Sequence, residues 1–326
     1  MKKQSYRKEL AFFLAVVALL AVALFSGLQI LESTVFYQGQ PQDHYVSKTL
    51  EVDGVSYFQR QDITTVLLMG IDRFGPVTHS QSYQNPGATD MNILLIFDQT
   101  AQSCTALHLN RDTMVKMPVL GIGGRPAGTD YGQLALAHTY GSGLEDSCEN
   151  TCATVSNLLG GIPIDYYVSM HMDAIAILND AVGGVTVEVT EDFSQVDAGI
   201  PMGTVKLLGD QAITFVRSRQ GVGDQKNTSR IARHEAYVSG FAKAFREAQA
   251  QNTEFIFEAY EDVLPYIVTN CSSKAASALI SRFEGYSIDR VLTLEGENTV
   301  GKQYWEFYPD QEKLDALILE LFYSPK

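Results

Sequence analysis

Three compact apolar runs lie in the first half of the chain, at residues 63–72, 91–98 and 104–113. The first two end in Asp, and the third alternates more clearly before it ends on the polar residues NRDT. Continuous apolar strands of this kind belong in the middle of a sheet that is covered on both faces. The runs therefore predict an α/β layer fold.

Further strands and helices alternate along the rest of the chain. The polar and apolar pattern predicts strands at residues 166–172, 183–189, 204–208 and 303–308. Asp210 is expected to cap a short helix that ends at Val216. Other helices are expected near residues 146–159, 173–181, 228–248, 254–266, 273–283 and 311–321. Because no linker interrupts this order, residues 56–326 are expected to form one domain.

An uncharged segment precedes this domain. Residues 10–28 hold no charged side chain, and these nineteen residues are about enough to cross the roughly 30 Å core of a bilayer. We therefore expect a transmembrane helix at residues 10–31. Basic residues precede it, so residues 1–9 are expected in the cytoplasm and the domain outside the cell. A cleaved signal peptide is the alternative, although the run is long and no clear A-x-A site follows. Residues 32–55 are expected to form a stalk or an edge strand.

Four arginines stand out against the charge of the chain. The formal net charge is −14, and the segment up to Glu32 has four basic and two acidic residues, which leaves −16 on the rest. Such a charge disfavours nucleic acid and anionic lipid as general partners. A guanidinium fork matches phosphate oxygens, so the cluster predicts a phosphate or pyrophosphate site. The alternative is a helix face that pairs with carboxylates of the chain. The cluster consists of Arg217, Arg219, Arg230 and Arg233.

Acidic residues near the strand ends form a second group of candidates. Asp72 closes the first apolar run, and Asp90 lies just before the second. Ligands of α/β sheets bind at strand ends, and two carboxylates with phosphate oxygens suit Mg²⁺. The alternative for Asp72 is a turn-forming role. Arg111 and Asp112 follow the third run, where they suit phosphate neutralisation and proton transfer as well as they suit a simple turn or rim ion pair.

Several other site classes are not supported by the sequence. The glycine clusters match neither a P-loop nor a dinucleotide-binding motif, and no G-x-S-x-G nucleophile motif occurs. Four cysteines in a chain of this length do not make a disulfide scaffold. The six histidines show no metal-ligand spacing, so structural zinc is not expected.

Taken in order, several segments resemble the LytR-CpsA-Psr family from about Thr64 to Phe245. These segments are LLMGID, TDMNILLIFD, LHLNRDTMV, GIPIDYYVSM, LNDAVGGVTVEV, LLGDQAITFVRSR and SRIARHEAYV. The resemblance implies a central mixed β-sheet flanked by helices on both faces, preceded by one transmembrane helix. It also implies a Gram-positive envelope enzyme that uses Mg²⁺ or Mn²⁺. Such an enzyme moves an anionic or capsular glycopolymer, such as teichoic acid, from a polyprenyl pyrophosphate carrier to peptidoglycan.

The same resemblance assigns roles to the candidate residues. It makes Asp72 and Asp90 the metal-binding acids of a catalytic site that also holds Arg111 and Asp112. The pyrophosphate-binding groups it implies are Arg217, Arg219, Arg230, Arg233, His234 and Arg73.

Several positions depart from the family pattern, two of them among the expected phosphate-binding groups. The family usually has Arg where this chain has Ala88, and Arg73 is a candidate to replace it. His234 stands where Gln is common. The alternative function is that of a non-catalytic polyprenyl-phosphate-binding or regulatory envelope protein. The expected partners are the lipid-linked glycopolymer, the peptidoglycan acceptor and the membrane bilayer, but not nucleic acid.

Overall fold

The computed structural model describes most of the chain from residue 49 onward. The described residues are 49–82, 84–121, 124–218, 220–223, 227–252, 261–272, 286–301 and 304–326, with a few positions between 259 and 283. No helix in this described part is long and apolar enough to span a membrane. The transmembrane helix expected at residues 10–31 lies outside it.

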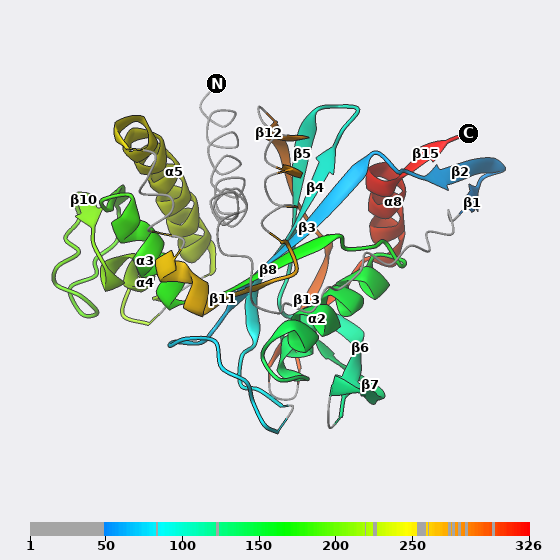
Figure 1. The fold of residues 1–326 in the computed structure, drawn as a ribbon, viewed down its shortest axis with the longest axis horizontal. Coiled ribbons are helices and arrows are strands. Elements are labelled where there is room, and N and C mark those ends of the chain that lie inside the picture. Colours follow the sequence, from blue (N-terminus) through cyan, green and yellow to red (C-terminus); the bar gives the residue numbers. More distant parts are fainter. Residues whose placement is uncertain are drawn as a thin grey trace, which may run out of the picture.

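A six-stranded mixed sheet forms the centre of the fold (Figure 1). Its strand order is β11-β8-β3-β4-β5-β12, in which β4 runs antiparallel to β3 and β5, whereas β8 and β12 pair in parallel with β3 and β5. The predicted mixed sheet and its first three strands are confirmed. The bounds are β3 Ile63–Ile71, β4 Thr89–Asp98, β5 Ser103–Leu109, β8 Tyr166–His171, β11 Ile267–Thr269 and β12 Ser287–Thr293.

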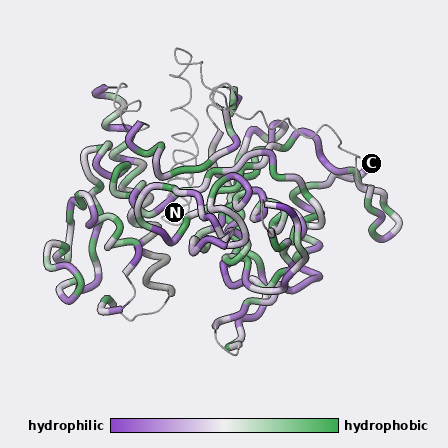
Figure 2. Tube along the Cα trace, turned by 60° about the horizontal axis from the view of Figure 1, so that its bottom comes forward, coloured by the Kyte–Doolittle hydropathy of each residue, from purple (hydrophilic) through white to green (hydrophobic). Residues whose placement is uncertain are grey.

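Both faces of this sheet are buried. Along β3, Leu67 and Met69 enter the core on one face, and Val66 and Leu68 enter the core on the other. The first face packs against α2 (Glu145–Leu158) and α8 (Gln311–Phe322). Helical residues that include Phe283 cover the second. The strands therefore read as continuous apolar runs because they have no solvent side. Figure 2 shows the apolar stretches mainly within the body of the protein.

Smaller sheets surround the centre. β1 (Thr49–Val52) and β2 (Val55–Gln59) pair with β15 (Tyr323–Pro325) near the C-terminus. β6 (Met114–Leu120) and β7 (Pro126–Gln133) form a hairpin, followed by the 3-10 helix η2 (Leu134–Thr139). A second hairpin joins β13 (Gly296–Val300) to β14 (Trp305–Pro309).

A second apolar core lies beside the sheet, on the left of Figure 1. The predicted helix α3 (Asp173–Ala181) is confirmed within its expected bounds. Asp210 is not the helix cap that its sequence position predicts, because Gly209 occupies that place with a φ of 51° and Asp210 is the first helical residue. The other elements of this core are β9 (Val185–Val189), β10 (Gly203–Leu207), α4 (Asp210–Arg217) and α5 (Asn227–Gln251).

Arg233 connects two helices inside this second core. It projects from α5 with only 6% of its surface exposed. Its guanidinium donates to the main-chain oxygens of Phe215 and Ser218 and forms an ion pair with Glu191. It also lies 5.6 Å from the ring centroid of Phe193. Arg233 therefore satisfies carbonyl groups at the end of α4 that the helix itself leaves without partners.

The loop between β3 and β4 is held against η2 and α2. The Asn85 side chain donates to the main-chain oxygen of His138 over 2.7 Å and to Ser147 Oγ over 3.0 Å. It also accepts a bond from the Gly87 amide over 2.8 Å. The Nδ1 atom of His138 lies 2.8 Å from the Gly87 oxygen. This buried network fixes the residues that lead into β4.

Acidification is expected to destabilise the fold through His138. Burial lowers the pKa of His138 from 6.5 to about 4, so the folded chain holds it neutral. Above pH 6.5 both the folded and the unfolded chain hold His138 neutral, so it costs no stability. As the pH falls from 6.5 toward 4, the unfolded chain takes up the proton first, and the free energy of unfolding falls by up to about 1.4 kcal/mol per pH unit. Urea unfolding at about pH 7 and about pH 5.5 measures this loss. In His138→Gln the pH dependence should be shallower, and an unchanged dependence would contradict the assignment.

Loss of Arg233 is expected to destabilise the second core. Arg233→Met leaves Glu191 and two carbonyl groups without their cation, and the free energy of unfolding should fall by about 3 kcal/mol. Urea unfolding followed by circular dichroism measures the change. The control is Lys243→Met, which removes an exposed ion pair with Glu247 on the same helix and should cost less than about 1 kcal/mol. Equal losses in the two variants would show that the buried contacts of Arg233 are unimportant.

Candidate functional site

Asp72 and Arg217 meet at the end of β3. Asp72 directly follows the strand, and its amide donates to the Ala88 oxygen over 3.0 Å. Arg217, the last residue of α4, donates to the Asp72 carboxylate over 3.0 Å and lies 5.3 Å from the ring centroid of Phe74. The Arg217 and Asp72 side chains are 51% and 38% exposed. An ion pair this exposed contributes only about 0–1 kcal/mol, so it can open at little cost to receive a ligand.

A bulge presents Asp90 on the neighbouring strand. Gly70 pairs with Met91, but the next residue, Ile71, pairs with Thr89, so Asp90 is an extra residue in β4. Bulges of this kind turn a side chain away from the regular alternation of the strand and are frequent beside active sites. The Asp90 carboxylate forms an ion pair with Arg111, which follows β5.

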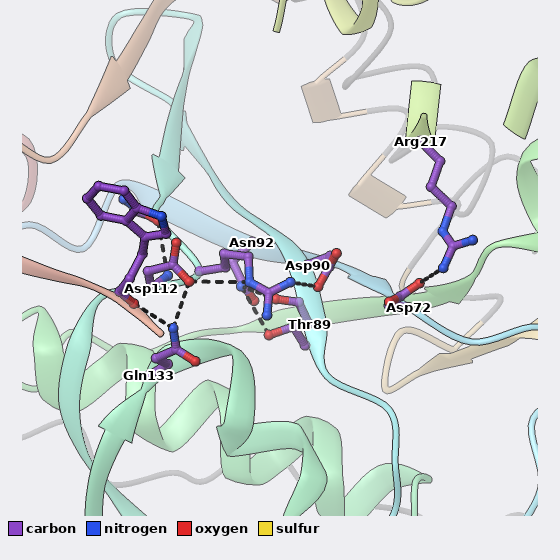
Figure 3. Close-up of polar contacts among 10 residues, drawn as sticks. Asp72, Thr89, Asp90, Asn92, Asp112, Gln133 and Arg217 are labelled. Carbon is purple, nitrogen blue, oxygen red and sulfur yellow. Dashed lines mark hydrogen bonds and ion pairs between the residues drawn. The ribbon is translucent and has the colours of Figure 1, made fainter. Parts of the chain in front are cut away.

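The turn after β5 links Arg111 to further polar groups. The Asn110 side chain accepts from the Asp112 amide over 3.0 Å, which fixes the turn. Arg111 Nε lies 3.5 Å from Asp112 Oδ1, and Gln133 Nε2 donates to the same oxygen over 2.8 Å. Gln133 also donates to the main-chain oxygen of Trp305 over 2.8 Å. Figure 3 shows the resulting line of contacts from Gln133 to Asp90, and the Asp72–Arg217 pair as a separate contact beyond Asp90.

Asn92 is a buried polar residue beside Asp90. Its side chain is fully buried and donates to the oxygen atoms of Thr89 over 3.2 and 3.1 Å. Its Oδ1 has no hydrogen-bond partner among the described residues. A buried acceptor without a partner costs about 1–3 kcal/mol. This oxygen is therefore a suitable additional ligand for a cation or for a bound hydroxyl group.

The structure brings five of the candidate residues into contact in two groups and leaves others apart. Asp72 pairs with Arg217, and Asp90 pairs with Arg111, which also contacts Asp112. Arg73 is exposed at the start of the same loop as Asp72. Arg219 lies outside the described residues, as do the side chains of Arg230 and His234 in α5.

Arg233 requires a correction. The sequence places it with the pyrophosphate-binding arginines, but its guanidinium is buried against α4 and Glu191. The reason is its position on α5: the face that carries Arg233 packs into the second core. It supports the segment that contains Arg217 instead of facing a ligand.

Two functional candidates are missing from the sequence-based assignment. Gln133 belongs to the site because it donates to Asp112. Asn92 belongs to it because it lies two residues after Asp90 on β4. A polar Asn inside the apolar run TDMNILLIFD is a usable signal for the second. Gln133 reaches Asp112 only through the β6–β7 hairpin, so its role needs the tertiary structure.

The groups of this site that could bind a metal ion are side-chain oxygen atoms. Within the described part of the chain, no group of three or more His, Cys, Asp or Glu side chains is placed to hold a metal ion. Asp72, Asp90 and the unpartnered Asn92 oxygen nevertheless form the donor chemistry that Mg²⁺ prefers. Mg²⁺ is commonly held by one or two carboxylates together with substrate phosphates, so the residues fit such an ion.

Relatives with curated names match about half of the chain. A polyisoprenyl-teichoic acid–peptidoglycan teichoic acid transferase, TagU, of Halalkalibacterium halodurans is 35% identical over 161 residues, which is 49% of this chain and 46% of the relative. The TagU protein of Enterococcus faecalis is 32% identical over 155 residues, or 48% and 45% of the two chains. The chain thus covers less than half the length of these relatives.

Solved structures share the fold over a larger region. TagT bound to LI-WTA covers 80% of this chain and 90% of its own, with a TM-score of 0.57 and 23% identity. Protein gbs0355 from Streptococcus agalactiae covers 80% and 86%, with a TM-score of 0.61 and 22% identity. The model of the LytR_cpsA_psr family matches residues 32–322. With a mixed α/β sheet and a family match over most of its length, the chain belongs to the LytR-CpsA-Psr family.

Proposed function

We propose that this chain is a phosphotransferase that moves a glycopolymer from a polyprenyl pyrophosphate carrier to peptidoglycan. The observation that carries the proposal is the pairing of two strand-end carboxylates, Asp72 and Asp90, with Arg217 and Arg111 at one edge of the sheet. Pairs of opposite charge suit a ligand that brings both phosphate and a cation. The family and the transferase names of its relatives support the same chemistry. A capsular polymer in place of a teichoic acid is compatible with this site.

The reaction is a substitution at phosphorus. A sugar hydroxyl of peptidoglycan forms a new bond to the phosphorus that carries the glycopolymer, and the bond from this phosphorus to the bridging oxygen breaks. Polyprenyl phosphate leaves with the electron pair, and the hydroxyl proton passes to a carboxylate, for which Asp90 and Asp112 are the candidates. Arg111, Arg217 and, by the family resemblance, Arg219 and Arg230 neutralise the charge of the phosphates.

The cofactor of the proposed reaction is Mg²⁺ or Mn²⁺. Asp72 and Asp90 would hold the ion, and the buried Asn92 oxygen is a further donor beside them. When bound, the ion would neutralise phosphate oxygens and polarise the phosphorus. The proposed placement rests on the sequence: an uncharged run after a basic N-terminus suits a helix at residues 10–31 that anchors the chain in the membrane, with residues 56–326 outside the cell.

Removal of one exposed arginine is expected to stop the reaction. In an assay of the full-length chain with a lipid-linked saccharide pyrophosphate, a peptidoglycan oligomer and Mg²⁺, Arg217→Ala should reduce transfer at least about 100-fold. The matched control is Arg290→Ala, which removes an exposed arginine that lies 2.6 Å from Glu320. Circular dichroism checks that both variants are folded. Wild-type transfer by Arg217→Ala would show that the site is wrongly placed.

The same assay separates the proposed enzyme from a binding protein. If the wild-type chain transfers no saccharide but binds polyprenyl phosphate tightly, the non-catalytic alternative holds. If it does neither, both functions are rejected.

Chelation is expected to abolish transfer by the wild-type chain. After treatment with EDTA, added Mg²⁺ or Mn²⁺ should restore the rate, whereas Asp90→Asn should remain inactive because it has lost a charged ligand. Isothermal titration with Mg²⁺ and a pyrophosphate ligand should show weaker binding in Asp90→Asn than in the wild type. Full transfer in the presence of EDTA would contradict the metal assignment.

A further inference from the structure

The β13–β14 hairpin exposes an unusual number of large apolar side chains. Val300 is 74% exposed, Tyr304 is 66% exposed and Trp305 is 59% exposed. Val300 pairs with Trp305 across the hairpin, whereas Tyr308, 40% exposed, lies on the opposite face of the strand and donates to Glu306 over 2.8 Å. Large apolar side chains gathered at one exposed place indicate a binding surface. We call residues 296–301 and 304–309 the aromatic hairpin.

The aromatic hairpin is attached directly to the candidate site. The Phe307 amide donates to the Asp112 oxygen over 2.9 Å, and Phe307 forms a bridge with Thr113. Gln133 donates to the Trp305 oxygen and to the Asp112 carboxylate, both over 2.8 Å. Phe307 itself is 5% exposed and anchors the hairpin in the main core. The exposed rings therefore extend the surface of the site beyond Asp112.

Charge restricts what this surface can bind. Within residues 296–309 the charged side chains are Glu297, Glu306 and Lys302, a net charge of −1. A surface without excess positive charge does not attract a polyanionic glycopolymer or an anionic bilayer. An uncharged sugar chain needs no such attraction. Sugar rings present an apolar C–H face that stacks on aromatic rings, and an indole N–H group such as that of Trp305 can donate to a sugar hydroxyl.

We propose that the aromatic hairpin binds the acceptor as an uncharged amino-sugar chain and leads its hydroxyl toward Asp112. The inference rests on the proposed transferase function and adds the place where the acceptor enters. In this arrangement the donor phosphates meet the arginines, and the acceptor approaches from the side of Gln133 and Trp305. The two substrates thus reach the site over surfaces of different charge and polarity.

Trp305 provides a direct test because it is the only tryptophan of the chain. We would titrate the full-length protein in detergent with an N-acetylglucosamine hexamer and follow tryptophan fluorescence. A saturable shift to shorter wavelength is expected, and poly(glycerol phosphate) at equal concentration should produce none. Absence of a shift with the hexamer would overturn the proposal. So would a shift that appears only when the protein is moved from neutral to anionic lipid nanodiscs, because it would identify a membrane contact.

Kinetics distinguish acceptor binding from donor binding. Trp305→Ala should raise the KM for a peptidoglycan oligomer at least about ten-fold and leave the KM for the lipid-linked donor unchanged. Met202→Ala, which truncates a side chain that is 65% exposed on the second core, is the control and should change neither value. An unchanged acceptor KM in Trp305→Ala would overturn the proposal. If the wild-type chain binds the hexamer but transfers nothing, the transferase function fails while the sugar-binding surface stands.

Discussion

Burial of β3 and β4 on both faces determines where this protein can place charge. The interior of either strand offers no solvent side, and an unpaired carboxylate there would be costly. Charged side chains are therefore found at the strand ends: Asp98 pairs with Arg60 at one end, and Asp90 pairs with Arg111 at the other. The first pair belongs to a rim that contains Asp62 and Thr100. The second faces the arginine of α4, so one edge of the sheet becomes an ionic site.

The second apolar core positions the arginine that faces this edge of the sheet. Arg217 reaches Asp72 because α4 ends beside the sheet. Arg233 holds this end of α4 through its hydrogen bond to the Phe215 oxygen. Two arginines of one sequence cluster therefore differ in burial and in their partners. Arg217 is exposed and weakly paired, whereas Arg233 is buried and held by three groups of the protein. Exposure, and not the type of residue, leaves Arg217 available to a ligand and makes Arg233 part of the core.

The sequence predicts the parts of the fold that have a clear period or apolar run. The strands β3 and β4 are predicted by their continuous apolar runs, and α3 is predicted by its helical period. The sequence does not predict β12, which pairs in parallel with β5 across more than half the chain, nor the β6–β7 hairpin, whose second strand is largely polar and exposed. For the site, single residues such as Asp72 and Arg111 can be named in advance. Their pairing, the bulge at Asp90 and the contact of Gln133 depend on register, which the local pattern does not contain.

In the proposed function, the ion pairs of the site would also couple the binding of oppositely charged ligands. With no ligand present, Arg217 is neutralised by Asp72, and Arg111 by Asp90. A cation that binds the two carboxylates releases both arginines for an anion, and an anion that binds the arginines releases both carboxylates for a cation. Each ligand should then raise the affinity of the other by the same factor, as thermodynamic reciprocity requires. The paired state thus favours joint binding of metal and phosphate over binding of either one alone.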